Sequence, residues 1–317
     1  MIDPLKLRVL RSVVETGSIR ASAEALGYTP SAVSQHLSAL KRETGLELIE
    51  RSGRGIVVTP AGRVLAEEAG AALEALDALA RTARNLREGR TGSLSFAYAS
   101  SVAAQWVPVI AQDVRSRFPD LALELTLRDC TRGWPPGYVP DVVICDDSTD
   151  LPTPRYQVID LIEEGYSALV GLDHPLAGRS SVPISALAEY AWATDDPPDS
   201  VWFDRIGSAC RAAGFSPNIE VNPPDFSVVL GFVASGDFVS VQPTLITLGL
   251  RPDVVAIPLD GMGPRRRLRV IVHEGVQHNP AAQHIIRRTR EMARDYVRSV
   301  PDVLDLTAPR EGATLGA

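Results

Sequence analysis

A face of small polar side chains in the segment 30–44 has the clearest chemical potential in this chain. Val33, Leu37 and Leu40 have the spacing of a buried helical stripe. Hydrogen-bonding side chains of little bulk fall on the opposite side, and these are Ser31, Ser34, Gln35 and Ser38. Such a face can lie against base edges in the major groove of DNA, where a glutamine amide can form two hydrogen bonds with adenine. The alternative interpretation is an ordinary amphipathic helix, so the flanking segments must decide.

The segments on either side favour DNA binding. Thr29 can cap this helix, Pro30 suits its first position, and Gly45 should end it. Two earlier helices are expected, one from Pro4 to Gly17 and one starting after Ser18. Apolar runs on both sides of residues 52–55 (SGRG) predict a hairpin with a glycine-rich tip. Residues 1–60 therefore predict a winged helix-turn-helix domain. Arg51 and Arg54 of the wing are candidate phosphate contacts or, alternatively, parts of an exposed basic turn.

A long helix is expected over residues 61–90. Apolar residues recur there with heptad spacing, at Leu65, Ala69, Ala72, Leu76, Leu79, Ala83 and Leu86. This pattern predicts a dimerisation seam. The alternative is a single amphipathic helix that packs on its own domain. The sequence 89–92 (GRTG) should end the helix as a linker.

Alternating strand and helix patterns fill residues 91–301. Strands are expected at 93–99, 121–127, 140–146, 166–171, 238–242, 254–258 and 268–272, and helices near 103–117, 202–213, 226–235 and 280–299. This alternation predicts an α/β domain with mostly parallel sheets and a cleft between two subdomains. We expect subdomain I at about 91–162 and 268–301, subdomain II at about 163–267, and a flexible tail at 302–317.

Charge and cysteine content narrow the class of protein. The net charge of the 317 residues is −7, yet residues 1–60 carry eight basic and six acidic side chains. A mildly basic head on an acidic body allows local phosphate contact without general polyanion binding. The three cysteines lack CxxC spacing, which indicates a reducing cytoplasm and no structural zinc. We expect a cytoplasmic protein without a signal peptide, a membrane span, a bound metal or another cofactor.

The quoted pieces, taken in order, resemble LysR-type transcriptional regulators over nearly the whole chain. The resemblance rests on residues 17–51 (GSIRASAEALGYTPSAVSQHLSALKRETGLELIER), 57–65 (VVTPAGRVL), 174–178 (HPLAG), 213–217 (AGFSP) and 233–243 (VASGDFVSVQP). Ile19 and Ile49 stand where the family commonly has phenylalanine, and the loop 133–137 (GWPPG) departs from the family pattern.

The resemblance implies a sequence-specific regulator that binds double-stranded promoter DNA. It implies a winged helix-turn-helix, a dimerising linker helix and a periplasmic-binding-protein-like effector domain, working as a homodimer or a dimer of dimers. By this resemblance Ser31, Ser34, Gln35 and Ser38 contact DNA, Thr29 and Pro30 position the helix, and His36, Arg51 and Arg54 contact phosphates. A small molecule would act as the effector, and RNA polymerase is a further possible partner.

The expected effector cleft lies where strands end and helices begin. Four pairs occupy such positions, namely Ser100 with Ser101, Cys130 with Thr131, Thr194 with Asp195, and Asp225 with Phe226. For each residue singly, helix capping is the better interpretation, whereas the resemblance favours a cleft for the group. Asp195 and Asp225 disfavour a simple dicarboxylate unless Arg128 or Arg132 compensates, and suit a ligand with an amine or several hydroxyls.

Two other classes of function remain as alternatives. A thiol-based redox regulator could use Cys130 and Cys145, although Cys145 sits in an apolar strand pattern. An enzyme of the α/β class is disfavoured because the sequence has no GxSxG, P-loop, HExxH or GxGxxG motif. The cluster Arg265, Arg266, Arg267 and Arg269 could bind a second polyanion, but a solvated strand entry is the expected role.

Overall fold

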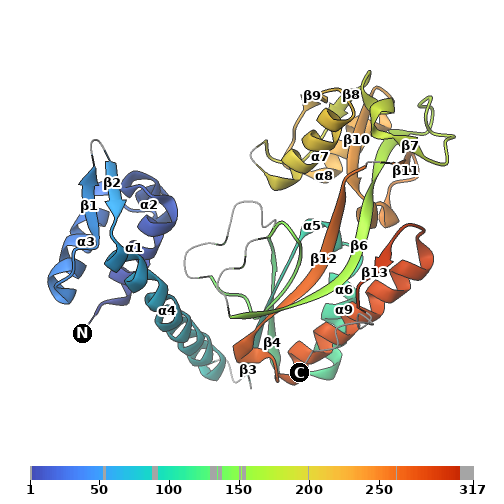
Figure 1. The fold of residues 1–317 in the computed structure, drawn as a ribbon. Coiled ribbons are helices and arrows are strands. Elements are labelled where there is room, and N and C mark those ends of the chain that lie inside the picture. The colour runs from blue at the N-terminus through green and yellow to red at the C-terminus, as the bar shows by residue number, and fades with distance from the viewer. Residues whose placement is uncertain are drawn as a thin grey trace, which may run out of the picture. The chain divides into compact units, whose positions relative to one another are not determined.

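The computed structural model of the chain describes residues 2–52, 55–87, 92–128, 134, 138–149, 151, 155–198, 200–261 and 263–307. The chain divides into two compact units, and the main division falls between Ser93 and Leu94 (Figure 1). The first unit holds the predicted winged helix and the long helix that follows it. The second holds the α/β part of the chain.

The first unit contains three short helices, a hairpin and one long helix. Their bounds are α1 (Pro4–Thr16), α2 (Ile19–Leu26), α3 (Pro30–Thr44), β1 (Ile49–Ser52), β2 (Gly55–Val58) and α4 (Pro60–Arg87). Ser18 caps α2 and Thr29 caps α3, each through its side-chain oxygen. Gly17 and Gly45 end α1 and α3 in the left-handed conformation, with φ of 64° and 71°. The predicted helix starts and stops are therefore confirmed here.

The core of the first unit forms where the apolar stripes of its helices meet. Leu10, Val13, Val33 and Leu40 are fully buried. The stripe predicted for α3 thus faces inward and leaves the polar side of that helix outside. A hydrogen bond of 2.8 Å between the buried hydroxyls of Ser12 and Ser22 joins α1 to α2.

The second unit is a continuous mixed sheet flanked by helices. Its strand order is β4-β3-β5-β12-β6-β10-β8-β9, with β7, β11 and β13 attached beside this path. The strands are β3 (Gly92–Tyr98), β4 (Leu121–Leu127), β5 (Val142–Asp146), β6 (Tyr156–Gly171), β7 (Val182–Pro183), β8 (Ala191–Ala193), β9 (Asn218–Val221), β10 (Phe238–Pro243), β11 (Val254–Asp260), β12 (Arg265–His273) and β13 (Leu304–Asp305). The helices are α5 (Ser100–Ala103), α6 (Val107–Arg117), α7 (Val201–Ala212), α8 (Phe226–Ala234) and α9 (Pro280–Ser299), with a 3₁₀ turn, η3, over Thr244–Gly249.

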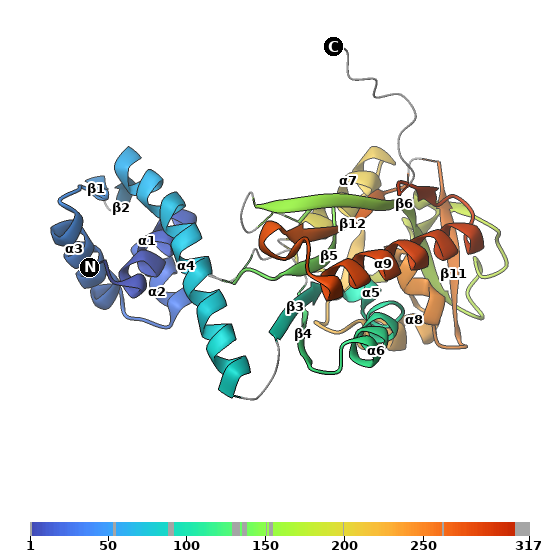
Figure 2. The same cartoon turned by 90° about the horizontal axis from the view of Figure 1, so that it is seen from below.

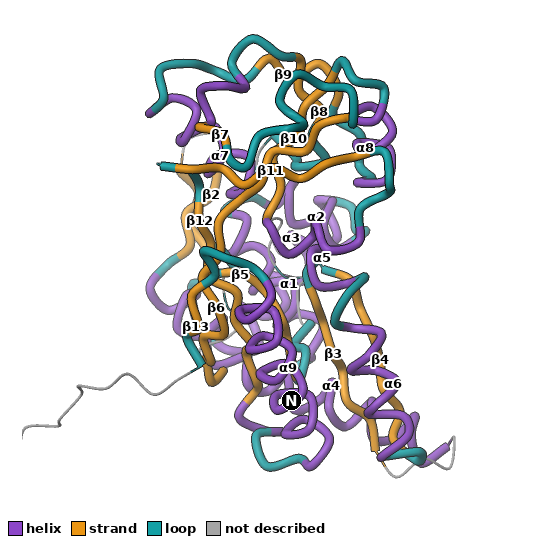
Figure 3. The backbone as a smooth tube through the Cα atoms, turned by 90° about the vertical axis from the view of Figure 1, so that its right-hand side faces the viewer, coloured by secondary structure: helices purple, strands orange, loops and turns teal. Residues whose placement is uncertain are grey.

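The prediction of mostly parallel sheets is wrong. Strands β3 and β5 run parallel, as do β8 and β10, but β6 pairs antiparallel with β10, β11 and β12. These antiparallel pairs all form on β6, which is one strand of 16 residues rather than the short strand expected at 166–171. Together β6 and β12 run from one subdomain into the other, as Figures 1 and 3 show. These two strands position the groups of the cleft described below.

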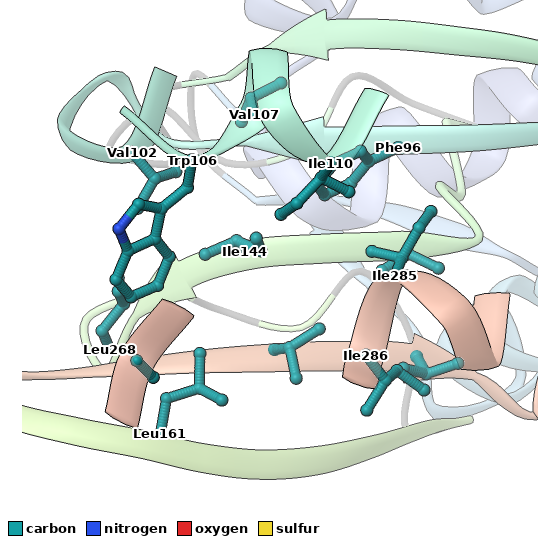
Figure 4. Packing of buried hydrophobic residues seen from close by; sticks show 14 of the residues in the cluster. Phe96, Val102, Trp106, Val107, Ile110, Ile144, Leu161, Leu268, Ile285 and Ile286 are labelled. Atoms are coloured by element: carbon teal, nitrogen blue, oxygen red, sulfur yellow. The ribbon is translucent and has the colours of Figure 1, made fainter. Parts of the chain in front are cut away.

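Helices α6 and α9 cover one face of the sheet in the first subdomain, where they pack side by side (Figure 2). Their apolar side chains meet those of the strands in one cluster. Figure 4 shows Trp106 and Ile110 near Ile144 of β5 and Ile285 of α9, all of them at most 3% exposed. Burial of this apolar surface, worth about 25 cal/mol per Å², holds the subdomain together.

Strand β6 alternates between two apolar clusters in the second subdomain. Ala168 and Val170 face a cluster that includes residues of α7, whereas Leu169 between them faces the cluster of α8. Both faces of the strand are therefore buried. This accounts for the nearly continuous apolar sequence from residue 166 to residue 171.

The expected flexible tail is wrong for residues 302–307. Leu304 and Asp305 form β13, which pairs with Glu163 and Ile162 of β6. Val303 is buried against the core of the first subdomain. Hydrogen bonding to β6 and this one apolar anchor order the segment. Residues 308–317 lie outside the described part of the chain.

Candidate DNA-contact surface and effector cleft

The outer side of α3 carries the predicted DNA-contact residues. Ser31, Gln35 and Ser38 are exposed, and Ser34 is half-buried beside them. The Ser34 hydroxyl donates to the Pro30 carbonyl at 2.9 Å, and the Ser38 hydroxyl donates to the Ser34 carbonyl at 2.8 Å. Because these hydroxyl protons bond to the helix backbone, the two serines offer oxygen acceptors outward. The serine oxygens of this face can thus accept hydrogen bonds from DNA, and the amide of Gln35 can both donate and accept them.

The residues at the start of α3 have the local roles predicted for them. The Thr29 Oγ1 atom accepts a hydrogen bond of 3.2 Å from the Ala32 backbone N–H, and Pro30 occupies the first helical turn. The ring of His36 is half-buried and lies 5.8 Å, centroid to centroid, from the ring of Tyr28. The predicted phosphate contact of His36 is not tested by these geometries.

The wing is a two-stranded hairpin, as predicted. Strands β1 and β2 pair antiparallel, with Ile49 opposite Val58 and Arg51 opposite Ile56. Arg54 lies outside the described residues. The predicted phosphate contacts of Arg51 and Arg54 therefore stay predictions.

Arg42 is a possible DNA contact that the sequence analysis did not single out. It is exposed and follows Gln35 by seven residues, so both lie on the same side of α3. Neighbouring Lys41 forms an ion pair with Glu47, whereas Arg42 has no carboxylate partner within the described residues. Its position at two helical turns from Gln35 was the signal that could have revealed it.

Helix α4 divides the predicted dimer seam into two parts. Leu65 and Ala69 pack against the core of the winged helix, together with Leu73, and an ion pair between Arg8 and Asp77 also links α4 to α1. The seam interpretation is therefore wrong at this end of the helix, because these side chains fill the core of their own domain. Exposed members of the seam follow, namely Ala72, Leu76, Leu79 and Ala83. The side chain of Leu86 lies outside the description.

A cavity of about 230 Å³ opens in the second unit. Ser100, Ser101 and Asp195, three of the predicted effector contacts, line it. Its other lining residues are Tyr166, Asp196, Pro197, Trp202, Pro224, Gln242, Pro243, Ile246 and Arg266. The elements that supply them come from both subdomains, so the cavity is the predicted cleft.

The other predicted effector contacts within the described residues do not line this cavity. Thr194 lines a neighbouring cavity of about 20 Å³ and accepts a hydrogen bond from the Asp196 N–H. Asp225 caps α8 by accepting a 2.7 Å hydrogen bond from the Ser227 N–H, and hydrogen bonding to the Ser227 side chain, together with this backbone bond, lowers the pKa of the Asp225 carboxyl. Phe226 packs with the apolar side chains of α8. Capping is thus the observed role of Asp225, and neither Asp225 nor Phe226 lines the cavity. Cys130 and Thr131 lie outside the described residues.

Arg266 corrects the expectation of a solvated arginine cluster. Its side chain is only 2% exposed, and its Nε and Nη2 atoms donate to Glu164 Oε1 at 2.9 and 2.7 Å. Burial works to lower the pKa of Arg266, but the charges of Glu164, Tyr166 and Asp146 and the hydrogen bond to Glu164 together outweigh burial, and the pKa rises. Arg265 and Arg267, its neighbours in β12, instead pair with Glu163. The signal was present in the alternation of β12, since Arg266 shares its strand face with buried Leu268, Val270 and Val272.

The buried Glu164 carboxyl group has several hydrogen-bond donors around it. Besides Arg266 it accepts hydrogen bonds of 2.8 Å from the Leu245 backbone N–H and from the Tyr296 hydroxyl. Burial, together with the charge of Glu164, raises the pKa of the Tyr296 phenol, so this group stays a donor. Arg266 is therefore fixed in position beside the cavity.

One wall of the cleft is held by contacts between β5 and α7. The Trp202 Nε1 atom donates to Asp146 Oδ2 at 2.5 Å, and Arg205 forms an ion pair with Asp147 at 3.0 Å. These contacts join the end of a first-subdomain strand to a second-subdomain helix. Burial raises the pKa of Tyr166, which also lines the cleft, to about 12, so its hydroxyl stays protonated.

The cysteines of the described part of the chain are buried. Cys145 lies in β5 at 1% exposure, and Cys210 lies in α7 at 0%. Burial raises the pKa of the Cys210 thiol to about 11, which disfavours the reactive thiolate. The redox alternative needs Cys130, which lies outside the described residues. Its proposed partner, Cys145, is buried in the core.

Neither a metal cluster nor a membrane span is found within the described ranges. No group of three or more His, Cys, Asp or Glu side chains there has the arrangement of a metal site. No described helix is long and apolar enough to cross a bilayer.

Comparison with known proteins gives two family matches that together cover most of the chain. Residues 5–63 match the bacterial regulatory helix-turn-helix protein, lysR family, and residues 87–294 match the LysR substrate binding domain. The HTH-type transcriptional regulator AlsR of Bacillus subtilis (strain 168) is 25% identical over 292 residues, which cover 88% of this chain and 93% of AlsR. A probable hydrogen peroxide-inducible genes activator of Streptomyces viridosporus is 28% identical and covers 94% of this chain and 96% of its own.

A solved structure gives the same fold. Full-length CbnR in complex with its target DNA matches with a TM-score of 0.51 at 19% identity, over 91% of this chain and 99% of the CbnR chain. At this identity the match concerns the fold. It supports an N-terminal helix-turn-helix with a linker helix, followed by an α/β domain with a mixed sheet.

Proposed function

This chain belongs to the LysR family of DNA-binding transcriptional regulators. We propose that it binds promoter DNA through α3. When a small molecule fills the cleft, the protein dissociates from the DNA or changes its arrangement on it. It is a regulator with an effector-binding domain and not an enzyme. We further propose that it works as a homodimer in the cytoplasm. The effector and the regulated genes are separate questions.

The exposed face of α3 carries the proposal for DNA contact. Ser31, Gln35 and Ser38 stand outward on a helix whose other side is locked in the core. The hydroxyls of Ser34 and Ser38 bond to the backbone, and Gln35 is the side chain on this face best able to form a two-point contact with a base. Arg42 on the same side supplies a charge for the phosphate backbone. CbnR, whose fold is similar, has been solved with its target DNA.

The exposed half of α4 supports the proposed dimer. Leu76 and Leu79 are 41% and 64% exposed, although both are large and apolar. The other half of the helix is anchored in the winged-helix core, so these two residues cannot turn inward without unpacking Ala69 and Leu73. Cover by the same helix of a second copy would remove this apolar surface from water.

The experiment that tests the proposal maps bound DNA in cells and then footprints the purified full chain on the enriched sites. A dimer predicts protection of two half-sites separated by about one helical turn, 10–10.5 base pairs, or a multiple of it. Protection should change when the effector is present. Absence of enriched sites, or protection without any repeated half-site, would contradict the proposal.

A further inference from the structure

The cleft combines groups of opposite charge with an apolar lining. Arg266 stands on one part of its wall and Asp195 and Asp196 stand on another. Between them lie an indole, three prolines and Ile246. A cavity of about 230 Å³ is smaller than the roughly 300–1,000 Å³ typical of sites for drug-sized ligands. The occupant must therefore be small and carry both polar and apolar parts.

The basic part of the wall offers hydrogen-bond donors. Glu164 engages the Nε and Nη2 atoms of Arg266, and this pair does not use Nη1. Ser101 is only 5% exposed, and its buried Oγ atom has no hydrogen-bond partner within the described part of the chain. A buried hydroxyl without a partner is unfavourable, so a ligand acceptor at this point would restore a lost interaction. A carboxylate meets the requirements of both Ser101 and Arg266.

The acidic part of the wall is fixed by a neighbouring amide. The Gln242 Nε2 atom donates to Asp195 Oδ1 at 2.9 Å, which orients the carboxylate of Asp195 along the wall. Asp196 follows it directly and is 9% exposed. A cation is the partner that two adjacent carboxylates at a cavity wall favour.

The sheet keeps the two charged parts of the wall apart. Strand β12, which carries Arg266, and strand β10, which carries Gln242, pair with opposite edges of β6. Two strand spacings of about 4.8 Å therefore separate their backbones, roughly 10 Å in all. Arg266 is paired with Glu164 on β6, whereas the carboxylate of Asp195 is bonded to Gln242 on β10. A ligand that bridges the cleft can meet both.

We propose that the cleft binds a zwitterionic small molecule of amino-acid size. Its carboxylate accepts hydrogen bonds from Ser101 and Arg266, its ammonium group faces Asp195, and its apolar part lies against Trp202. This inference rests on the proposed function, because it assumes that the cleft is the effector site.

Ligands with one kind of charge fit the same walls less well. A dicarboxylate would bring its second negative group toward Asp195 and Asp196, where like charges repel. A simple amine would leave the Ser101 hydroxyl without an acceptor and would place no group at Arg266. Both predictions concern affinity and can be measured with matched compounds.

The test uses the full chain and sets of three related compounds. Each set contains an L-amino acid, the acid that lacks its amine and the amine that lacks its carboxylate, for example phenylalanine, 3-phenylpropionate and phenethylamine. The sets cover the twenty common amino acids, with γ-aminobutyrate and 5-aminovalerate added. Thermal shift identifies binders and calorimetry gives their affinities. We expect at least one zwitterion to bind about tenfold or more tightly than both of its relatives.

Asp195→Asn isolates the proposed ammonium contact. Asparagine keeps an oxygen that can accept from Gln242, so the wall keeps its local geometry while it loses charge. The variant should lose about tenfold or more in affinity for the zwitterion and leave the weak binding of the amine-free acid unchanged. Asp237→Asn, an exposed position outside the cleft, is the matched control and should bind like the wild type.

The outcomes separate this inference from the proposed function. If amine-free acids or simple amines bind as tightly as the zwitterions, or if Asp195→Asn binds the zwitterion normally, the ligand class is wrong while the cleft remains an effector site. If no compound of these sets binds but nucleosides or sugars do, the ligand class is again wrong. If none of these classes binds, both the inference and the effector role of the cleft are contradicted.

Discussion

Arg266 illustrates how a single residue can be misjudged from its neighbours in sequence. Four arginines within five residues suggest a solvated patch, but strand alternation sends Arg265 and Arg267 to Glu163 and turns Arg266 inward to Glu164. The acidic partners lie about 100 positions earlier in the chain, so sequence spacing carries no sign of them. Ser100, Ser101 and Asp195 do line the cavity, because strand ends at a sheet edge follow from local pattern, and their contact with an effector stays a prediction.

Removal of Arg266 alone should destabilise the second unit strongly. Arg266→Met leaves the buried Glu164 carboxylate without its cation, and breaking a buried pair typically costs about 3–5 kcal/mol. The double variant Arg266→Met with Glu164→Gln removes the unpaired charge and should recover more than half of that loss. Urea unfolding of the full chain measures both. Equal stability of the single and double variants would show that the buried charge is not the cause.

His174 should make the second unit sensitive to mild acid. Burial lowers the pKa of His174 below its ordinary value of 6.5, and the ring Nε2 has no hydrogen-bond partner among the described residues. Between the two pKa values the unfolded chain binds more protons, so this contribution is complete above about pH 6.5 and is lost as the pH falls. His174→Asn keeps an acceptor for the Leu176 N–H but does not titrate.

The measurement for His174 is the melting temperature of the full chain between about pH 7.5 and about pH 5.5. The His174→Asn variant should lose less stability over this range than the wild type. The variant should still lose some stability as the pH falls, because a second histidine contributes. Burial and nearby Arg287 lower the pKa of His284 as well. An identical pH profile for the variant and the wild type would contradict the role of His174.

Gln35 and Arg42 should affect DNA binding in different ways. Gln35→Ala should cost about 1–3 kcal/mol at one base pair and relax the preference there, because it removes a base-edge contact. Arg42→Ala should weaken binding evenly across sequences and reduce the salt slope by about 1, because it removes a phosphate contact. Competition binding to operator variants at several salt concentrations separates the two. Unchanged base preference in Gln35→Ala would show that α3 reads DNA through other residues.

At the scale of elements, local signals located the helices better than the strands. The starts of α2, α3 and α9 follow from Ser18, Thr29 and Asn279, each of which caps its helix in the structure. The length of strand β6 is not predictable from local pattern, because Glu163, Glu164 and Gly165 are residue types that are uncommon inside buried strands. These residues are held there by Arg265, Arg266 and Arg267 on the adjacent strand. Short strands such as β8, β9 and β13 depend on their neighbours in the same way.

Helix α4 should dimerise through its C-terminal half alone. Leu79→Glu places a charge on the exposed seam and should shift the full chain from dimer to monomer at micromolar concentration, because a charged group would enter an apolar contact. Val64→Glu is the control, since Val64 is 60% exposed on the same helix but lies off the seam. Sedimentation velocity measures both. A dimer in Leu79→Glu would place the interface elsewhere.

At the scale of the whole molecule, sequence order alone was enough to predict the class of protein. A helix-turn-helix, a wing, a long helix and an α/β domain in this order are specific together. The family matches cover residues 5–63 and 87–294, on either side of the long helix. The direction of the strands was not predictable in this way. It depends on how β6 and β12 run through both subdomains. The same course of β12 places Arg266 at the wall of the cleft. Local pattern cannot reveal a strand that serves two subdomains.

The most direct test of the central claim is the affinity of the full chain for its mapped operator with and without a saturating cleft ligand. We predict that the zwitterion identified by calorimetry changes the operator dissociation constant or the footprint of the wild type, and that Asp195→Asn no longer responds at the same ligand concentration. Fluorescence anisotropy and footprinting on one operator fragment measure both. Operator binding that is identical with and without a ligand shown to occupy the cleft would contradict the account.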